Sequence, residues 1–191
     1  MTITWVWLLA FLLGSIPFGL LLAKTRRVDL RQHGSGNIGA TNVVRTLGKA
    51  AGLLTLFGDA GKGYLGVWIA GQVLETPWAI AGAGLMAYLG HVYSIFLKFK
   101  GGKGVATGLG IYLYLMPLSA MSAVGVFILV LALTRYVSIG SMLGAASIPL
   151  SGLAFNSPDM YIYLGWVTLG ITVWRHRENI QRLRQGTEGK F

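Results

Sequence analysis

The chain alternates between long apolar stretches and short polar ones. Seven apolar stretches approach or reach the roughly 20 residues that a helix needs to cross a bilayer. Pro117 divides the fourth stretch from the fifth, and we interpret them as two helices with a turn at Met116-Pro117, although one kinked helix also fits these residues. The pattern predicts an all-α polytopic membrane protein with spans at residues 3–23, 51–73, 78–97, 105–118, 119–133, 139–155 and 160–174.

Composition favours the same interpretation. Hydrophobic residues make up 54% of the 191 residues, and the mean hydropathy is +0.63. A soluble domain of this length has too little interior to bury so much apolar side chain. The length suits a single domain, which we assign to residues 1–191. Because the chain has no cysteine, a disulfide framework, a thiol nucleophile and a cysteine-based metal site are excluded.

The positive charges lie in alternate connections between the predicted spans. Apart from Lys62, every Lys and Arg follows the first, third or fifth span or lies in the C-terminal tail. Basic connections stay in the cytoplasm, so we predict seven transmembrane helices with the N-terminus outside and the C-terminus cytoplasmic. One kinked helix around Pro117 would break this alternation. The net charge of +10 is thus mainly a topology signal, and nucleic acid is not expected as a partner.

The first basic connection contains a run of glycine and small polar residues followed by Arg45. Glycine lets backbone N–H groups converge on an anion, the polar side chains add hydrogen-bond donors, and arginine can donate two bonds to one phosphate. A flexible linker is the alternative, but linkers rarely mix in Asn, Thr and Arg. The sequence favours a phosphate-binding loop, with candidate residues Gly34, Ser35, Gly36, Asn37, Gly39, Thr41 and Asn42.

The third connection, K-F-K-G-G-K-G-V-A-T, runs directly into the fourth predicted span. Glycine, lysine and threonine at a helix N-terminus favour anion binding, because free N–H groups and the helix dipole point the same way. The spacing differs from a Walker A loop, so a nucleotide is not implied. Lys98 and Lys100 can also be interfacial anchors. Our candidates here are Gly102, Lys103, Gly104 and Thr107.

The C-terminal tail begins R-H-R-E-N-I-Q-R and is expected to continue the last helix. On one helix Arg175, Asn179 and Arg182 form a stripe at i, i+4 and i+7, with His176 beside Asn179. Glu178 can pair with Arg175 or Arg182. The alternative is a basic cluster that binds anionic lipid, but that role needs neither the histidine nor the asparagine.

Polar residues within the spans are weaker candidates. Asp59 and Lys62 are spaced i, i+3 inside the second span, where a functional pair and a structural pair are equally plausible. His91 lies deep in the third span and can be a hydrogen-bonded core residue. Ser138 and Ser141 lie at the inner end of the sixth span, where they can join a site, although serines that pack helices together are the commoner case.

Three segments, in order, resemble the signature motifs of bacterial acyl-phosphate:glycerol-3-phosphate 1-acyltransferases. They are GSGNIGATNVVR, GHVYSIFLKFKGGKGVAT and RHRENIQRLRQGTE; GDAGKG and YVSIGS look like that family's intervening segments. The resemblance covers nearly the whole chain. It implies a multi-pass, seven-helix enzyme of phospholipid synthesis in the bacterial inner (cytoplasmic) membrane, with its active site facing the cytoplasm.

The resemblance also implies the reaction. A fatty acyl group passes from acyl phosphate to the 1-hydroxyl of glycerol 3-phosphate, giving lysophosphatidic acid and inorganic phosphate. No metal or organic cofactor is expected. The expected partners are the two substrates and membrane lipid, with no obligatory protein partner. The His-x4-Asp box of other glycerolipid acyltransferases is absent, because none of the three histidines has Asp five positions later.

An acyl phosphate is already activated, so the enzyme's tasks would be to neutralise and align two anions. We expect two sets of residues, one for each phosphate, although the two assignments can be exchanged. The set for the acyl phosphate is Ser35, Asn37, Thr41 and the backbone of residues 102–104. The set for glycerol 3-phosphate is Arg45, Lys103, Ser141, His176 and Asn179. The base is either His176 or an oxygen of the substrate's own phosphate. The predicted catalytic residues are Ser35, Arg45, Lys103, His176 and Asn179. The predicted substrate-binding residues are Gly34, Gly36, Asn37, Gly39, Thr41, Asn42, Gly102, Gly104, Thr107, Ser141, Glu178 and Arg182.

Other classes of protein fit less well. A transporter for an anionic metabolite would need polar residues across the whole bilayer, and only Asp59 and Lys62 favour it. A lipid-binding scaffold would not need the ordered glycines, and a CDP-alcohol phosphotransferase would need clustered aspartates. Small residues such as Gly82 and Gly110 either open a groove for the acyl chain or let helices pack closely.

Overall fold

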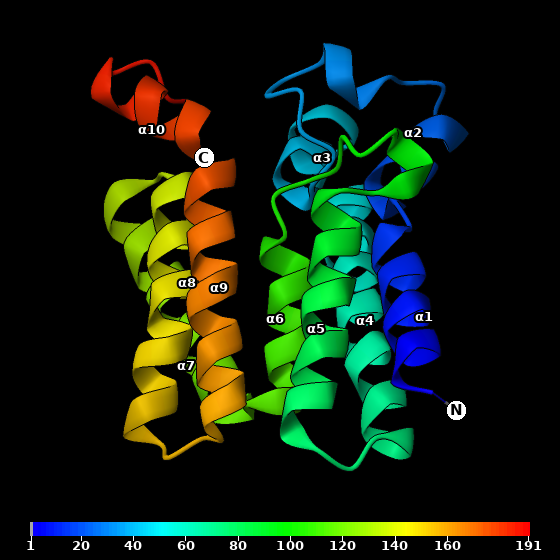
Figure 1. Cartoon of the computed structure of the whole chain (residues 1–191). Coiled ribbons are helices and arrows are strands. Elements are labelled where there is room, and N and C mark those ends of the chain that lie inside the picture. Colours follow the sequence, from blue (N-terminus) through cyan, green and yellow to red (C-terminus); the bar gives the residue numbers. More distant parts are fainter. Residues whose placement is uncertain (1) are drawn as a thin grey trace. The chain divides into compact units, whose positions relative to one another are not determined.

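The computed structural model describes residues 2–191, which form helices and connections with no strand. The chain divides into two compact units, Met1–Ile111 and Tyr112–Phe191. Each is a bundle of helices that run roughly alongside one another (Figure 1). The all-α prediction is confirmed for the described residues.

The first unit is a bundle of α1, α4, α5 and α6, with the other helices gathered at one end (Figure 1). Helix α1 packs against α4 and α5, α4 packs against α5, and α3 packs against α4. The last residues of α6 belong to the second unit. The elements are α1 (Ile3–Ser15), α2 (Phe18–Thr25), the 3-10 helix η1 (Leu30–Gln32), α3 (Ala40–Leu47), α4 (Lys49–Val73), α5 (Pro77–Val92), the 3-10 helix η2 (Ile95–Leu97) and α6 (Val105–Leu115).

The second unit places α8 between α7 and α9, since α8 packs against both. The short α10 follows α9 and is joined to it at His176. The C-terminal residues return to the start of α8, where the Phe191 N–H donates to the Arg135 carbonyl at 2.8 Å. The elements are α7 (Pro117–Thr134), α8 (Val137–Ala154), α9 (Asp159–Arg175) and α10 (Arg177–Arg184).

Prolines set two of the helix boundaries. Pro117 occupies the first turn of α7, and Met116 has φ −145°, so residues 105–134 form two helices as predicted. The first predicted span needs a correction, because it breaks at Ile16-Pro17 into α1 and α2. A proline inside a helix removes one N–H donor and clashes with the preceding turn.

Each predicted span contains a helix, and the outward surfaces of these helices are apolar. Leu133 is 76% exposed and Phe57 is 70% exposed, as suits side chains that face lipid. Length and composition alone qualify four helical segments of the described chain as membrane spans. They are Ile3–Thr25, Pro77–Leu97, Pro117–Thr134 and Val137–Ala154, with the shorter apolar helix Val105–Leu115 beside them.

Close helix contacts depend on glycine, which decides between the two roles considered for Gly82 and Gly110. A Cβ at Gly82 would overlap the ring of Trp7, and one at Gly110 would overlap the Ala60 carbonyl. These glycines therefore let helices pack closely, and they do not line an open groove for an acyl chain.

Candidate active site

The loop before α3 is organised around the side chain of Asn42. This side chain is 1% exposed, and its Nδ2 group donates to the carbonyls of Leu30, His33 and Asn37 at 3.1, 3.0 and 2.8 Å. Its Oδ1 accepts from the Ser35 N–H at 2.8 Å. Asn42 thus holds the loop in one conformation, which corrects our expectation that it contacts substrate.

The backbone of the rest of this loop depends on two glycines, and polar side chains in and after the loop are exposed. Gly34 and Gly36 have φ values of +60° and +69°, which favour glycine, and a Cβ at Gly34 would overlap Asn42 Oδ1. Ser35 is exposed, while Arg45 lies exposed in the last turn of α3. The loop can therefore present a hydroxyl and a guanidinium group from a fixed backbone.

We expect Asn42→Ala to lower the melting temperature in detergent by about 5 °C or more. Each buried polar group left without a partner costs about 1–3 kcal/mol, and a chain of this length loses about 2–4 °C for each kcal/mol. The matched control is Gln32→Ala, which removes only an exposed hydrogen bond to Asp29 in the same segment. Equal melting temperatures for the two variants would contradict the role given to Asn42.

The loop before α6 is tied to the end of α5. The N–H groups of Gly101 and Gly102 donate to the carbonyls of Val92 and His91, both at 3.1 Å. The N–H of Gly102 is therefore engaged in holding the loop, so an anion would be met by groups from Lys103 onward. The Tyr88 hydroxyl donates to the Lys103 carbonyl at 3.3 Å, and the Lys103 residue is half-buried.

The first turn of α6 adds one unusual hydroxyl. Thr107 is fully buried, and its Oγ1 atom has no hydrogen-bond partner in the described chain. A buried hydroxyl without a partner is costly, so it is a candidate to meet a ligand at the helix start. This loop and the loop before α3 lie at the same end of the first unit (Figure 1).

The second unit holds its candidate residues where α9 meets α10. His176 is 3% exposed, and its Nδ1 lies 2.8 Å from the Thr172 carbonyl. A carbonyl only accepts, so Nδ1 carries the proton and Nε2 of the neutral ring is the acceptor. The predicted stripe needs a correction, because α9 ends at Arg175 and α10 begins at Arg177 instead of forming one continuous helix.

Comparison with known proteins decides what class of site this is. A family model described as glycerol-3-phosphate acyltransferase matches residues 4–186. The chain belongs to the glycerol-3-phosphate acyltransferase family. The acyltransferase of Geobacter sulfurreducens is 51% identical to it over 183 residues, which cover 95% of this chain and 94% of that protein. One from Thermus thermophilus is 47% identical over 187 residues, which cover 98% of this chain and 94% of that protein.

Solved structures give the same family. The acyltransferase matches crystal structures of PlsY (YgiH), an integral membrane glycerol 3-phosphate acyltransferase, in two forms. The glycerol 3-phosphate form has a TM-score of 0.96 and 40% identity, and the lysophosphatidic acid form has a TM-score of 0.94 and 39% identity. Each match covers 99% of this chain and 95% of the other. The chain is therefore an integral membrane protein of the acyltransferase class.

Sequence reasoning assigned no role to Glu188 of this acyltransferase. Its carboxylate accepts from Ser138 Oγ at 2.8 Å, from Asn179 Nδ2 at 2.6 Å and from Arg182 Nε at 2.8 Å. Arg182 thus pairs with Glu188, not with the exposed Glu178. The sequence does show Glu188 as a single acidic residue after a strongly basic segment. No spacing rule, however, connects Glu188 to Ser138.

The environment of Glu188 changes its acidity. Partial burial would raise the pKa of this carboxyl, but the hydrogen bonds from Asn179, Arg182 and Ser138 and the charge of Arg182 together lower it below its usual value of 4.5. A carboxyl whose pKa is lower in the folded protein stabilises the fold at pH values above its unfolded pKa. That stabilisation is lost as the pH falls through the folded pKa.

We therefore expect Glu188→Gln to lower the melting temperature by a few degrees at pH 7, and the difference from the wild type to shrink below about pH 4.5. The reason is the loss of charge-assisted hydrogen bonds, each worth about 1.5–3 kcal/mol. Thermal unfolding in detergent across this pH range is the measurement. Glu75→Gln, an exposed acid between α4 and α5, is the control and should change little. A difference that stays constant down to pH 3 would contradict the assigned charge.

The remaining predicted residues have a mixed outcome. Ser141 is 5% exposed on α8, one turn after Ser138. The Asp59–Lys62 pair predicted from spacing is confirmed, with Nζ 2.8 Å from Oδ1 and both side chains 3% exposed. Thr41 and Gly39 lie at the start of α3, where Gly39 is the capping residue.

Proposed function

We propose that this chain transfers a fatty acyl group from acyl phosphate to the 1-hydroxyl of glycerol 3-phosphate, giving lysophosphatidic acid and inorganic phosphate. The observation that carries the proposal is the family match over residues 4–186, which includes the first two polar motifs and all but the last two residues of the third. The forms in which PlsY was solved, with glycerol 3-phosphate and lysophosphatidic acid, fit this acceptor and this product. The acyl phosphate donor rests on the motif resemblance and on the chemistry below.

The chain would work as one domain, with its site at the cytoplasmic surface of the inner membrane. In this arrangement the chain crosses the bilayer seven times, with its N-terminus outside. Support comes from the gathering of the two loops at one end of the first unit. It also comes from the alternation of basic connections along the sequence. The Ser35 and Lys103 loops of the first unit would form its phosphate-binding part.

Phosphate binding would fall to the cationic and neutral donors of these segments. Arg45 and Lys103 would neutralise the phosphate of glycerol 3-phosphate, and Asn179 and Ser141 are further donors proposed for the same substrate. Ser35 and the start of α6 would hold the acyl phosphate headgroup, where the buried Thr107 hydroxyl adds a donor. Neutralisation of two mutually repelling anions is the main contribution expected of the protein.

The chemical step needs one proton acceptor. The 1-hydroxyl oxygen of glycerol 3-phosphate attacks the acyl carbonyl carbon, the bond from this carbon to the phosphate oxygen breaks, and phosphate leaves with the bonding electrons. His176 Nε2 would take the hydroxyl proton, since the Thr172 carbonyl holds the proton of the same ring on Nδ1. An oxygen of the acyl phosphate is the competing acceptor. No covalent acyl-enzyme is required, because phosphate is already a good leaving group.

Phosphate release by the purified protein tests this function. With acyl phosphate and glycerol 3-phosphate together we expect phosphate and lysophosphatidic acid in equal amounts, and little of either without the acceptor. To identify the donor, acyl-CoA and acyl carrier protein thioesters are assayed in parallel with acyl phosphate. Turnover of a thioester with no turnover of acyl phosphate would overturn the proposed donor while leaving the acyltransferase class intact.

A further inference from the structure

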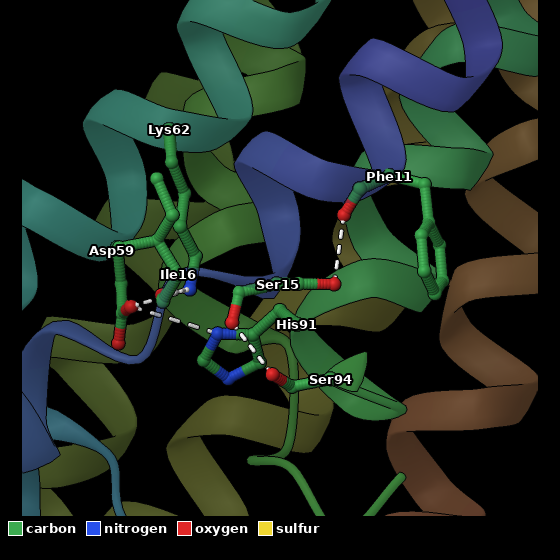
Figure 2. A network of polar contacts seen from close by, with 7 residues as sticks. All are labelled: Phe11, Ser15, Ile16, Asp59, Lys62, His91 and Ser94. Atoms are coloured by element: carbon green, nitrogen blue, oxygen red, sulfur yellow. Dashed lines mark hydrogen bonds and ion pairs between the residues drawn. The ribbon is translucent and has the colours of Figure 1, made fainter. Parts of the chain in front are cut away.

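A network of buried polar groups lies between the helices of the first unit (Figure 2). Lys62 on α4 donates to the Ile16 carbonyl at 2.6 Å and pairs with Asp59 at 2.8 Å. Asp59 Oδ1 is also 3.6 Å from His91 Nδ1 on α5. Asp59, Lys62 and His91 are each 4% exposed or less. The network therefore connects three helical segments through atoms that bulk solvent does not reach.

One end of this network is the break between α1 and α2. Proline at position 17 interrupts the helix, and the Ile16 carbonyl there accepts from Lys62. The Phe18 ring lies 5.9 Å from the ammonium group, so the charge also has an aromatic neighbour. Lys62 thus fixes the position of the break relative to α4.

The other end of the network is the loop before α6. The carbonyl of His91 accepts from the Gly102 N–H at 3.1 Å. A Cβ at Gly102 would overlap His91 Nε2, so the ring itself lies directly against this glycine. The Nδ1 edge of the ring faces Asp59, and the Nε2 edge faces the loop. His91 is therefore the link between a buried carboxylate and the residue preceding Lys103.

Packing alone does not explain this arrangement. A buried ion pair is often no more stabilising than apolar side chains of the same size, and charges within a bilayer are costly. What ionic and hydrogen-bonded groups add is a defined geometry. Here that geometry is transmitted to Gly102, and thus to Lys103, which follows it directly.

We propose that Asp59 and His91 are positioning residues for Lys103. Asp59, itself held by Lys62, sets the orientation of the His91 ring, and the ring supports Gly102 so that Lys103 meets the phosphate of glycerol 3-phosphate. The inference rests on the proposed function only in assigning that phosphate to Lys103. It gives the buried charges of α4 a role in substrate affinity, although they do not touch substrate.

A double-mutant cycle on glycerol 3-phosphate binding tests the proposal, measured by calorimetry on the full chain in detergent without a donor. We expect Asp59→Asn and His91→Ala each to raise the Kd about tenfold in the wild-type background. In a Lys103→Ala background the same changes should raise it less than twofold, because both act through this lysine. Thr55→Val, which removes a buried hydroxyl from the same helix, is the matched control and should leave binding unchanged.

His91→Asn and His91→Gln separate the two edges of the ring. The Asn amide can replace Nδ1 towards Asp59, while the Gln amide can replace Nε2 towards the loop, so neither alone should restore wild-type binding. If Asp59→Asn fails to fold, Asp59→Asn with Lys62→Met removes both charges together, and its Kd should still rise about tenfold.

Equal losses of affinity in the wild-type and Lys103→Ala backgrounds would overturn the proposal, and so would unchanged binding in stable Asp59 and His91 variants. Both readouts are independent of the acyl donor. If the protein fails to use acyl phosphate but the coupling to Lys103 is found, the proposed donor is wrong and the positioning role stands.

Discussion

Replacing Arg45 with alanine is expected to lower kcat/KM by about 10²- to 10³-fold, by analogy with the loss seen when one donor is removed from an oxyanion site. Arg45 lies exposed in the last turn of α3, so the change should leave the fold intact. Its guanidinium group can donate two parallel bonds to a phosphate, and no neighbouring lysine reproduces that fork.

Arg45→Lys is the matched variant for this prediction. It keeps the charge but loses the paired geometry, so its activity should lie between those of the wild type and Arg45→Ala. Initial rates of phosphate release at several glycerol 3-phosphate concentrations give kcat and KM separately. Near-normal kcat/KM in Arg45→Ala would remove this residue from the site.

Replacing His176 with alanine is expected to reduce kcat by about 10²-fold or more, as loss of a general base does. The ring is buried, and the Thr172 carbonyl holds it in the tautomer that accepts at Nε2. Added imidazole should restore part of the activity, because a small base can enter the space left by the side chain. A merely structural role would not be rescued in this way.

A proton transfer to the acyl phosphate itself, in place of His176, predicts a different result. If an oxygen of the acyl phosphate takes the proton, His176→Ala should lose less than about tenfold and imidazole should have no effect. Thr172→Val is the companion variant. It removes the hydrogen bond from Thr172 Oγ1 to the Thr168 carbonyl but keeps the contact between His176 and the Thr172 backbone carbonyl. It should therefore retain most of the wild-type turnover.

Helix positions could be predicted from the sequence because they depend on local properties. Apolar length and the proline at position 117 were enough to separate α6 from α7. The helix break at Pro17 was missed because the apolar run continues on both sides of it. The Ile16 carbonyl at this break accepts a hydrogen bond from Lys62, which is 46 residues away in the sequence. The break at His176 was missed for a similar reason, since nothing in R-H-R-E interrupts a helical pattern.

The candidate site could be predicted by residue type more readily than by role. Asn42 was predicted as part of the polar loop, but it lies in α3 and its side chain bonds back to that loop. Contacts between segments that are distant in the sequence could not be predicted from the pattern of hydrophobic and polar residues. The carboxylate of Glu188 and the ring of His91 each meet their partners only because separate helices bring them together.

The hydrogen bond from Lys62 of α4 to the break between α1 and α2 also bears on how the protein enters the bilayer. Among the described residues, α4 is absent from the helices that qualify as spans by composition, and its Asp59 and Lys62 would each oppose insertion by about 2.5–3.5 kcal/mol at mid-bilayer. The Ile16 carbonyl offers the lysine a partner that lipid lacks. During synthesis, then, α1 and the break that follows it should already lie in the membrane when α4 leaves the translocon.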